Sequence, residues 1–381
     1  MPGTKGKDDN RFYFIDALRA SMILIVFEHA LDGRHVTELA EFLPNFLSVP
    51  LFHTGHFAVS LFFIISGFVI AHNLSPLVID LKVAGKFLLR RSLRLDPPYW
   101  AAIMLMCALA YVSYRTMPGK EPPAYSATAL VAHLFYLQDL LGIPQIDIAY
   151  WTLCIEFQFY TLIILVFFVL GGKLIEGNLA LRCAVILLTL FSLLWPLGIL
   201  KNSVPGLIAP RLYEFLFGVV CYWAYKDPPV RRYFVLSGGA LLLWAIYTAN
   251  SFLVFDCVTS MLLFFMSVSQ NLSAGKNWRP LQFLGKISYS MYLTHNPITG
   301  AMFRIGYLST GRYLWSEVLW LIVTVAVVVL FAFGWWRFIE KPSTRLSQKI
   351  RLSKPAVLDQ SGAPTSALPI DGPRLKKLSA G

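Results

Sequence analysis

The stretch Arg11–Leu31 constrains this chain more than any other, because it combines a membrane-crossing length with several ionisable side chains. It reads RFYFIDALRASMILIVFEHAL and carries Asp16, Arg19, Glu28 and His29. An ionisable group at mid-membrane costs roughly 2.5–3.5 kcal/mol on insertion scales, so each of them is a candidate functional residue. The alternative is a plain membrane anchor, with its charges in the two interfaces and Asp16 neutralised by Arg19 three residues later.

The composition indicates an all-α, polytopic integral membrane protein. The 381 residues are 56% hydrophobic and 14% charged, with a mean hydropathy of +0.60, whereas soluble domains average about 25% charged residues. Apolar runs of about 20 residues, the length of a membrane-crossing helix, recur along the chain. The net charge of +12 would favour nucleic acid in a soluble protein. Here basic cytoplasmic loops account for it, so we expect membrane lipid as a partner and no nucleic acid.

About ten transmembrane helices are predicted. An even number places both termini on one side, and Lys and Arg are concentrated in the segments of that side. The positive-inside rule therefore predicts cytoplasmic N- and C-termini. The predicted spans are 12–31, 51–72, 97–114, 149–170, 182–200, 207–225, 233–250, 252–271, 284–304 and 314–338.

This pattern divides the chain into a cytoplasmic N-terminal tail (1–11), a transmembrane domain (12–342) and a largely disordered, basic cytoplasmic tail (343–381). The first apolar run is interpreted as an uncleaved helix, because it is long for a signal peptide and no small-residue cleavage site follows it. In the outer loop 115–148, the apolar segment Ala129–Leu141 is too short to span and is predicted to be interfacial or re-entrant.

The cysteines indicate neither a disulfide framework nor a zinc site, because all lie in apolar runs and no pair has CxxC spacing. They are Cys107, Cys154, Cys183, Cys221 and Cys257. We expect no metal site and no bound cofactor.

A cluster of arginines precedes the third span, in KFLLRRSLRLDPPYW. Arg90 and Arg94 share a helix face, with Arg91 beside them. A guanidinium group can donate two parallel hydrogen bonds to phosphate oxygens, which favours a phosphate-binding site. The positive-inside rule explains the same pattern without a ligand. We expect Pro97 and Pro98 to stop this helix before the third span.

Polar side chains also occur inside the second and fourth spans. Ser66 lies in SLFFIISGFVI, where small residues let helices approach closely, so packing is its simpler explanation. Glu156 lies about two turns inside YWTLCIEFQFY, near Tyr160, and a carboxylate there must be paired, protonated or facing a polar cavity. A structural ion pair with Arg19 or Arg211 is the alternative for Glu156.

The ninth span, FLGKISYSMYLTHNPI, places Ser288, Tyr292 and His295 at i, i+4 and i+7, on one helix face. The alternative for His295 is an interior histidine that donates to a carbonyl. At the start of the sixth span, Arg211 and Glu214 are three residues apart and can form a local ion pair.

Six of these segments resemble the membrane-bound acyltransferase-3 family, whose members move acyl groups, often acetyl, onto sugars and polysaccharides. They follow the family's order from Asp16 to Pro342 and cover nearly the whole chain, and YWTLCIEFQFY is the most specific match. The segments are IDALR with the later His of the first span, SLFFIISGFVI, RRSLR, YWTLCIEFQFY, LGKISYSMYLTH and EKP.

The resemblance implies an O-acyltransferase of the bacterial inner membrane. Its co-substrate would be cytosolic acyl-CoA, most simply acetyl-CoA, and its acceptor a carbohydrate on the outer face. We assign His29 as the general base for the acceptor hydroxyl, because imidazole titrates near neutrality, with Glu28, Asp16 or Glu156 orienting it or offsetting its charge. Arg19 would bind a donor phosphate or stabilise developing negative charge. The donor-binding set is Arg19, Arg90, Arg91 and Arg94, and the acceptor or secondary set is Ser66, Tyr160, Ser288, Tyr292 and His295.

One spacing departs from the family pattern, which places ten residues between the first-helix Arg and His. Arg19 and His29 have nine residues between them. On an ideal helix this leaves the two side chains about 80° apart in angle and about 15 Å apart along the axis. Either the helix is locally irregular, or Arg19 and His29 face different partners.

A transporter or channel is the main alternative, because buried acids, arginines and histidines also form proton or solute paths. It predicts solute flux without an acyl product, and the lack of an inverted repeat counts mildly against it. A sensor or scaffold predicts that Glu156 and His29 matter only for folding. For an enzyme, the sequence leaves open the acceptor carbohydrate and whether the group is acetyl, succinyl or longer.

Overall fold

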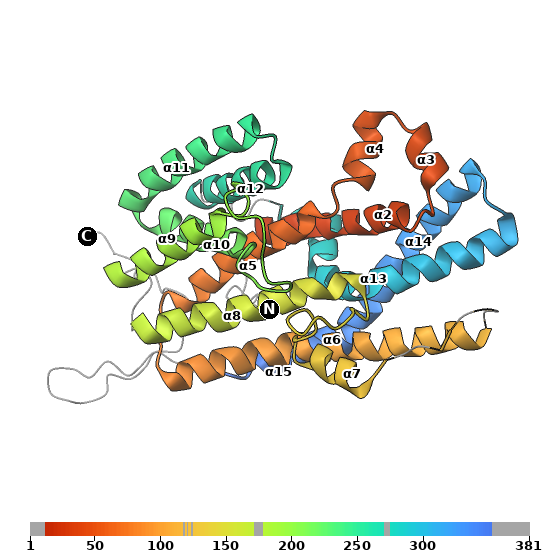
Figure 1. Cartoon of the computed structure of the whole chain (residues 1–381), viewed down its shortest axis with the longest axis horizontal. Helices are drawn as coiled ribbons and strands as arrows, with labels where there is room; N and C mark the ends of the chain where they lie inside the picture. Colours follow the sequence, from red (N-terminus) through yellow and green to blue (C-terminus); the bar gives the residue numbers. More distant parts are fainter. Residues whose placement is uncertain are drawn as a thin grey trace, which may run out of the picture.

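The computed structural model describes residues 12–116, 119, 121–122, 125–170, 178–269 and 275–352, which form an elongated bundle of helices (Figure 1). Within these residues the chain contains no strand, so the all-α prediction is confirmed there. The predicted tail 1–11, and most of the predicted tail 343–381, lie outside the described residues.

The helical elements follow one another with short connections. In chain order they are α1 (Tyr13–Arg19), η1 (Ala20–Met22), α2 (Ile23–Asp32), α3 (Thr37–Phe42), α4 (Asn45–Phe52), α5 (Phe57–Leu74), α6 (Leu81–Thr116), α7 (Ala127–Leu134), η2 (Ile148–Tyr150), α8 (Trp151–Leu170), α9 (Leu179–Leu193), α10 (Leu212–Lys226), α11 (Pro228–Tyr247), α12 (Ser251–Val268), α13 (Arg279–Thr310), α14 (Leu314–Trp335), the π-helical turn η4 (Trp336–Glu340) and α15 (Lys341–Gln348).

Five helical segments of the described chain are long and apolar enough to cross a membrane, as expected for a multi-pass membrane protein. Each of the ten predicted spans coincides with a described helix. Ten membrane crossings and cytoplasmic termini remain predictions. The five segments are Phe57–Leu74, Leu81–Thr116, Ile148–Leu170, Ser251–Val268 and Leu314–Gln348.

The prediction that Pro97 and Pro98 stop a helix was wrong, because both lie inside the continuous helix α6. Proline removes a backbone donor, but inside a bundle neighbouring groups satisfy the backbone and the helix continues. Close to the prolines α6 also packs against α13, whose Tyr289 hydroxyl donates to the carbonyl oxygen of Leu95 at 2.9 Å. One helix therefore carries both the arginine cluster and the third predicted span.

The first predicted span is helical but not uniform, because the 3₁₀ turn η1 separates α1 from α2. A 3₁₀ turn advances about 120° per residue, against about 100° in an α-helix. Over the ten steps from Arg19 to His29, three such residues reduce the angular separation from about 80° to about 20°. The helix is therefore locally irregular, and the irregularity returns Arg19 and His29 to one face.

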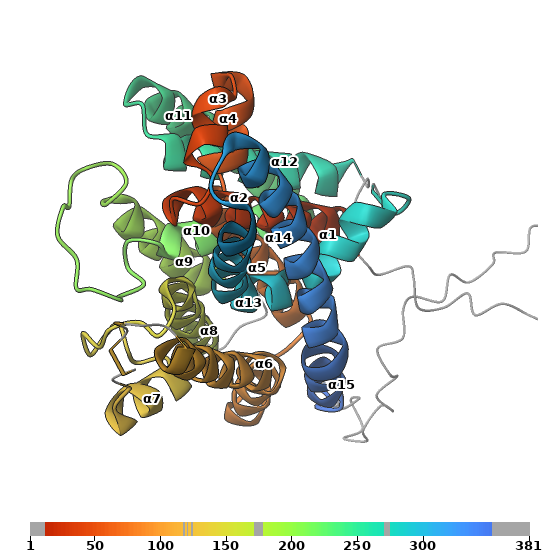
Figure 2. The ribbon, with the colours of Figure 1, turned by 90° about the vertical axis from the view of Figure 1, so that its right-hand side faces the viewer.

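Two glycines allow α5 and α10 to pack closely. A Cβ on Gly67 would lie 1.8 Å from the carbonyl oxygen of Phe215, and one on Gly218 would lie 1.9 Å from that of Ile64. Figure 2 shows α5 and α13 in the interior, surrounded by the other helices. The packing role predicted for this small-residue segment is thus confirmed for Gly67.

Gly67→Ala is expected to destabilise the fold by about 1–3 kcal/mol or more, because the added methyl group overpacks the contact with α10. Thermal unfolding of the purified protein in detergent measures the change. Gly85→Ala is the matched control, because a Cβ added there in α6 meets nothing within 4 Å. Equal unfolding temperatures for the two variants would contradict this account of the α5–α10 contact.

The helix predicted within Ala129–Leu141 is shorter than expected and shifted, since α7 ends at Leu134. The fully buried His133 joins α7 to the following loop: its Nδ1 lies 2.7 Å from the carbonyl oxygen of Ala129, and its Nε2 accepts from the Ile146 N–H at 3.1 Å. Burial lowers the pKa of His133, which suits a neutral ring that donates and accepts at once. The loop leading to α8 is held in place by these bonds.

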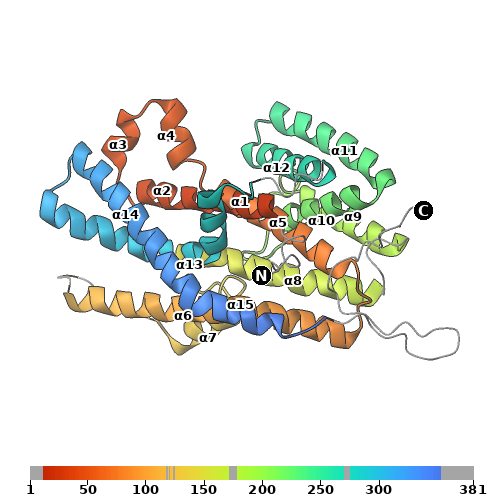
Figure 3. The same ribbon diagram turned by 180° about the vertical axis from the view of Figure 1, so that it is seen from behind.

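The last described helix, α15, lies along α6 (Figure 3). It crosses the domain boundary predicted at residue 342. The first residues of the predicted tail therefore pack in the helical bundle.

Candidate active site

Two histidines that are 266 residues apart in sequence meet inside the bundle. His29, in the last turn of α2, places its Nδ1 2.8 Å from Nε2 of His295 in α13. The two rings are stacked, with centroids 4.8 Å apart. His295 is fully buried, whereas His29 is partly exposed. The ring of His29 is therefore the one that a ligand can reach.

The bonding pattern assigns the protons in this pair. His295 Nδ1 lies 2.9 Å from the carbonyl oxygen of Tyr292 and 3.2 Å from that of Met291. Carbonyl oxygens only accept, so Nδ1 carries the proton and Nε2 of the neutral ring accepts from His29 Nδ1–H. Neutral His29 is then unprotonated at Nε2, as a general base requires.

A polar group from the α7–α8 loop completes the surroundings of the histidine pair. Asp147 is close enough to His29 for their charges to interact, and it accepts from the Asn296 amide at 3.1 Å and the Ala149 N–H at 2.8 Å. Burial raises the pKa of Asp147, and these bonds act in the opposite direction. Asp147 thus acts on His29 and is held by Asn296, and the sequence analysis singled out neither residue.

Glu28, the neighbour of His29 in sequence, belongs to a different contact. Its carboxylate accepts from the backbone N–H of His56 and lies 2.6 Å from the Nδ1 of the same residue. The His56 ring packs against Phe252 of α12. Glu28 therefore ties α2 to the start of α5 and does not orient His29.

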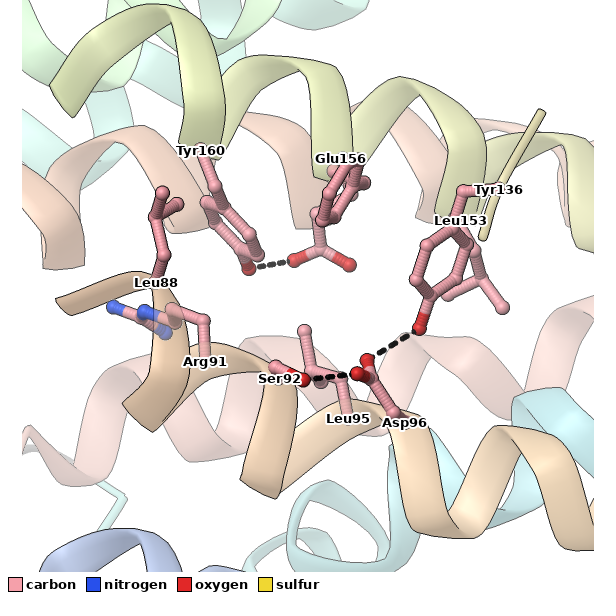
Figure 4. Close-up of a pocket in the computed structure, with 10 residues that line it drawn as sticks. Leu88, Arg91, Ser92, Leu95, Asp96, Tyr136, Leu153, Glu156 and Tyr160 are labelled. Carbon is pink, nitrogen blue, oxygen red and sulfur yellow. Dashed lines mark hydrogen bonds between the residues drawn. The ribbon is translucent and has the colours of Figure 1, made fainter. Parts of the chain in front are cut away.

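Glu156 projects from α8 toward α6 into a cavity between the two helices (Figure 4). Its Oε1 accepts from the Tyr160 hydroxyl, and from the Ser66 hydroxyl at 3.2 Å. Across the cavity, Asp96 of α6 accepts from the Tyr136 hydroxyl at 2.8 Å. Glu156 thus faces a cavity and accepts hydrogen bonds from two hydroxyl groups, one of them that of Ser66. We call this space the Asp96 cavity.

Two further cavities adjoin the Asp96 cavity and share lining residues with it. One shares Leu153 and Glu156 with it and is lined by Tyr292; we call it the Tyr292 cavity. The other shares Arg91 and is lined by residues of α15; we call it the arginine cavity. Glu156 thus lines two of the three cavities, and Arg91 also lines two.

Three partly buried guanidinium groups line the arginine cavity: Arg90, Arg91 and Arg94. None of them belongs to an ion pair in the described part of the chain. Arg91 lies over the ring of Tyr160, 5.1 Å from its centroid. Partly desolvated cations without counter-charges are costly, so this cavity suits an anionic ligand such as a phosphate.

Arg19 and a glutamate missed by sequence reasoning lie beside this cluster. Arg19 pairs with Asp16 at 3.7 Å, and its charge interacts with that of Arg94. Glu340, at the end of η4, accepts from the Ser290 hydroxyl at 2.5 Å and interacts with both arginines. π-helical turns recur at functional sites. The closing EKP segment was the only sequence signal for Glu340.

Two residues predicted to belong to the site, Asp16 and Ser288, do not contact the histidine pair. Asp16 lies thirteen residues before His29, about 20 Å along the helix axis, and contacts Arg19 instead. The Ser288 hydroxyl donates to the carbonyl oxygen of Gly285 in its own helix, and Ser288 is absent from the linings of the three cavities. Neither side chain therefore contacts His29.

The ion pair expected from the sixth span is confirmed. Arg211 contacts Glu214 at 2.9 Å, and it lies over the rings of Trp151 and Phe252. The alternative in which Glu156 pairs with Arg211 or Arg19 does not occur among the ion pairs of the described residues.

A family model described as an acyltransferase domain, that of the acyltransferase-3 family, matches residues 12–337. Because this match covers most of the chain, the chain belongs to the acyltransferase-3 family.

A protein of Bacillus subtilis (strain 168) named "Putative peptidoglycan O-acetyltransferase YrhL" is similar to this chain, with 25% identity over 356 residues. The similarity covers 82% of this chain and 54% of that protein, so the chain spans about half the length of this curated relative. No solved structure matches the chain.

Proposed function

We propose that this protein is a multi-pass O-acyltransferase of the bacterial inner membrane that moves an acyl group from cytosolic acyl-CoA to a carbohydrate hydroxyl. Membership of the acyltransferase-3 family supports the reaction class. The main support for the donor is the arginine cavity, whose three arginines form no ion pair in the described part of the chain and which shares Arg91 with the Asp96 cavity. The name of the B. subtilis relative makes peptidoglycan glycans the first acceptor to test.

In this mechanism His29 Nε2 removes the proton of the acceptor hydroxyl as its oxygen attacks the thioester carbonyl carbon. His29 then becomes an imidazolium whose Nδ1–H donates to His295, a charge-assisted bond that is stronger than the neutral one. Collapse of the tetrahedral intermediate breaks the carbon–sulfur bond. The thiolate takes the proton from His29, which yields CoA, the acyl ester and neutral His29.

Arg90, Arg91 and Arg94 bind the CoA phosphates in this proposal, and Arg19 adds positive charge on the same side. The pantetheine arm extends from the arginine cavity past Arg91 and Glu156 into the Tyr292 cavity. The acceptor then meets the thioester beside His29. In this proposal Glu156 contacts the pantetheine arm, because it lines two of the three cavities and is not bonded to His29.

Arg91→Ala and Arg94→Ala are each expected to weaken acyl-CoA binding about tenfold, because each removes a charge-assisted bond to phosphate. Titration of the purified protein with acetyl-CoA measures the Kd. Arg232→Ala, which removes an exposed charge of α11, is the matched control and should leave the Kd unchanged. Arg91→Lys should recover only part of the affinity, because lysine lacks the planar fork. Wild-type affinity in both alanine variants would contradict the phosphate assignment.

Membranes containing the protein test the reaction itself. Radiolabelled acetyl-CoA should transfer its label to the carbohydrate fraction, and His29→Ala membranes should not transfer it. A solute flux that needs no acyl-CoA, without an acyl product, would instead favour the transporter.

A further inference from the structure

The Tyr292 cavity presents mainly apolar surface, although several polar side chains line it. The Thr152 hydroxyl lies 2.6 Å from that of Tyr292, which also lies 2.5 Å from the carbonyl oxygen of Ala149. The Tyr289 hydroxyl donates to Leu95, and the Ser66 hydroxyl to Glu156. These hydroxyls are bonded to the protein, so the Glu156 carboxylate is the charged group that the lining offers to a ligand.

The aliphatic and phenyl side chains of the walls come from three elements. One face of α5 contributes Val59, Phe62 and Phe63, which lie at the i, i+3 and i+4 positions of a helix face. The 3₁₀ turn η1 contributes the buried Met22, and α8 contributes the buried Leu153. Val59 and Phe62 are only partly buried: both line the cavity and also pack against the hydrophobic core.

The same helices carry the cavity and the histidine pair. Met22 precedes His29 by seven residues, which places them on one face about two turns apart. Tyr292 precedes His295 by three residues, and their ring centroids are 6.0 Å apart. The cavity therefore lies one to two helical turns from the ring that the proposed mechanism uses as base, on the side facing Glu156 and the arginines.

We infer that the Tyr292 cavity holds the acyl group during transfer and that Val59 and Phe62 set the length of the acyl chain that the enzyme accepts. This inference rests on the proposed function. An acyl chain is apolar beyond its carbonyl and gains free energy in proportion to the apolar area that it buries. The bonded hydroxyls and the aliphatic and aromatic walls match a short alkyl chain and disfavour a charged acyl group such as succinyl, whose carboxylate would find no cation among the cavity's lining residues.

Two substitutions of opposite effect test the inference. Phe62→Ala lengthens the cavity and is expected to raise the affinity for hexanoyl-CoA relative to acetyl-CoA about tenfold, and Val59→Phe shortens it and is expected to lower that ratio about tenfold. The Kd values of CoA, acetyl-CoA, butyryl-CoA and hexanoyl-CoA are measured by titration of the purified full-length protein. Free CoA carries no acyl group, so an unchanged Kd for CoA shows that a variant is folded and retains its donor site.

Matched controls use the same changes on the exposed surface: Phe331→Ala in α14 and Val258→Phe in α12. Both should keep the wild-type ratio. Opposite shifts in the two cavity variants support the inference. Unchanged ratios in variants that bind CoA normally would overturn the acyl-pocket assignment and leave the proposed function intact. Failure of the wild-type protein to bind any of the four CoA compounds would overturn both.

Discussion

His29→Ala is expected to lower acyl transfer by about 10²–10⁴-fold while leaving the Kd for acyl-CoA unchanged. Removing a general base has this magnitude, and His29 is absent from the linings of the three cavities assigned to the donor. The rate of CoA release by membranes that contain the acceptor, together with a donor titration of the purified protein, measures the two quantities separately.

The control for this experiment is His53→Ala, because His53 is an exposed histidine at the end of α4. It should transfer at the wild-type rate. If His29→Ala retained the wild-type rate with normal donor binding, another group would be the base and the role of the histidine pair would be structural.

His295→Ala is expected to lower the transfer rate by about 10–150-fold, less than His29→Ala. In the mechanism His295 never touches the substrate; it accepts from His29 and stabilises the imidazolium that forms. A hydrogen bond to a charged group contributes about 1.5–3 kcal/mol, which corresponds to that loss of rate. His295 is therefore a positioning residue, and its loss should lower kcat more than it raises the donor KM.

His295→Gln separates this role from simple packing. Its side-chain carbonyl oxygen can reach the position of Nε2 and accept from His29 Nδ1–H, so it should recover part of the lost rate. The two variants should also differ in the pH dependence of kcat, which reports the base in the bound complex. Equal losses of rate in His295→Ala and His295→Gln, with unchanged pH profiles, would indicate a purely structural histidine.

The helices were predictable because their signal is local. Long apolar runs identify membrane helices whatever their neighbours are, and each predicted span coincides with a helix. Local rules failed where contacts between helices determine whether a helix continues. Pro97 and Pro98 break isolated helices, yet α6 continues through them within a bundle where it packs against α8, α13 and α15.

The site shows the same division between local and long-range information. His29 and His295 were each predictable as polar residues in apolar helices, but their 2.8 Å contact joins positions 266 residues apart, which no periodicity reveals. Asp147 and Asn296 were missed for the same reason, because they contact each other from segments 149 residues apart in sequence. The 3₁₀ turn at Ala20–Met22 contains neither glycine nor proline, so the sequence showed the unusual spacing without showing how it is accommodated.

The arginine cluster illustrates a limit of a different kind. Its spacing on a helix was evident, and the structure adds that Arg90, Arg91 and Arg94 lack ion pairs in the described part of the chain and line a cavity. The positive-inside rule alone predicts cytoplasmic charges exposed to water. A partly buried, unpaired cluster that opens toward Glu156 is better explained by an anionic ligand.

The most direct test of the account is an experimental structure of the protein with an acyl-CoA analogue whose thioester is replaced by an unreactive thioether. The phosphates of the analogue are expected at Arg90, Arg91 and Arg94, and its arm is expected to pass Glu156. Its acyl group is expected in the Tyr292 cavity, on the side nearest His29. An analogue bound at the end of the bundle that carries α3 and α4, or one whose acyl group lies in the arginine cavity away from the histidine pair, would contradict the account.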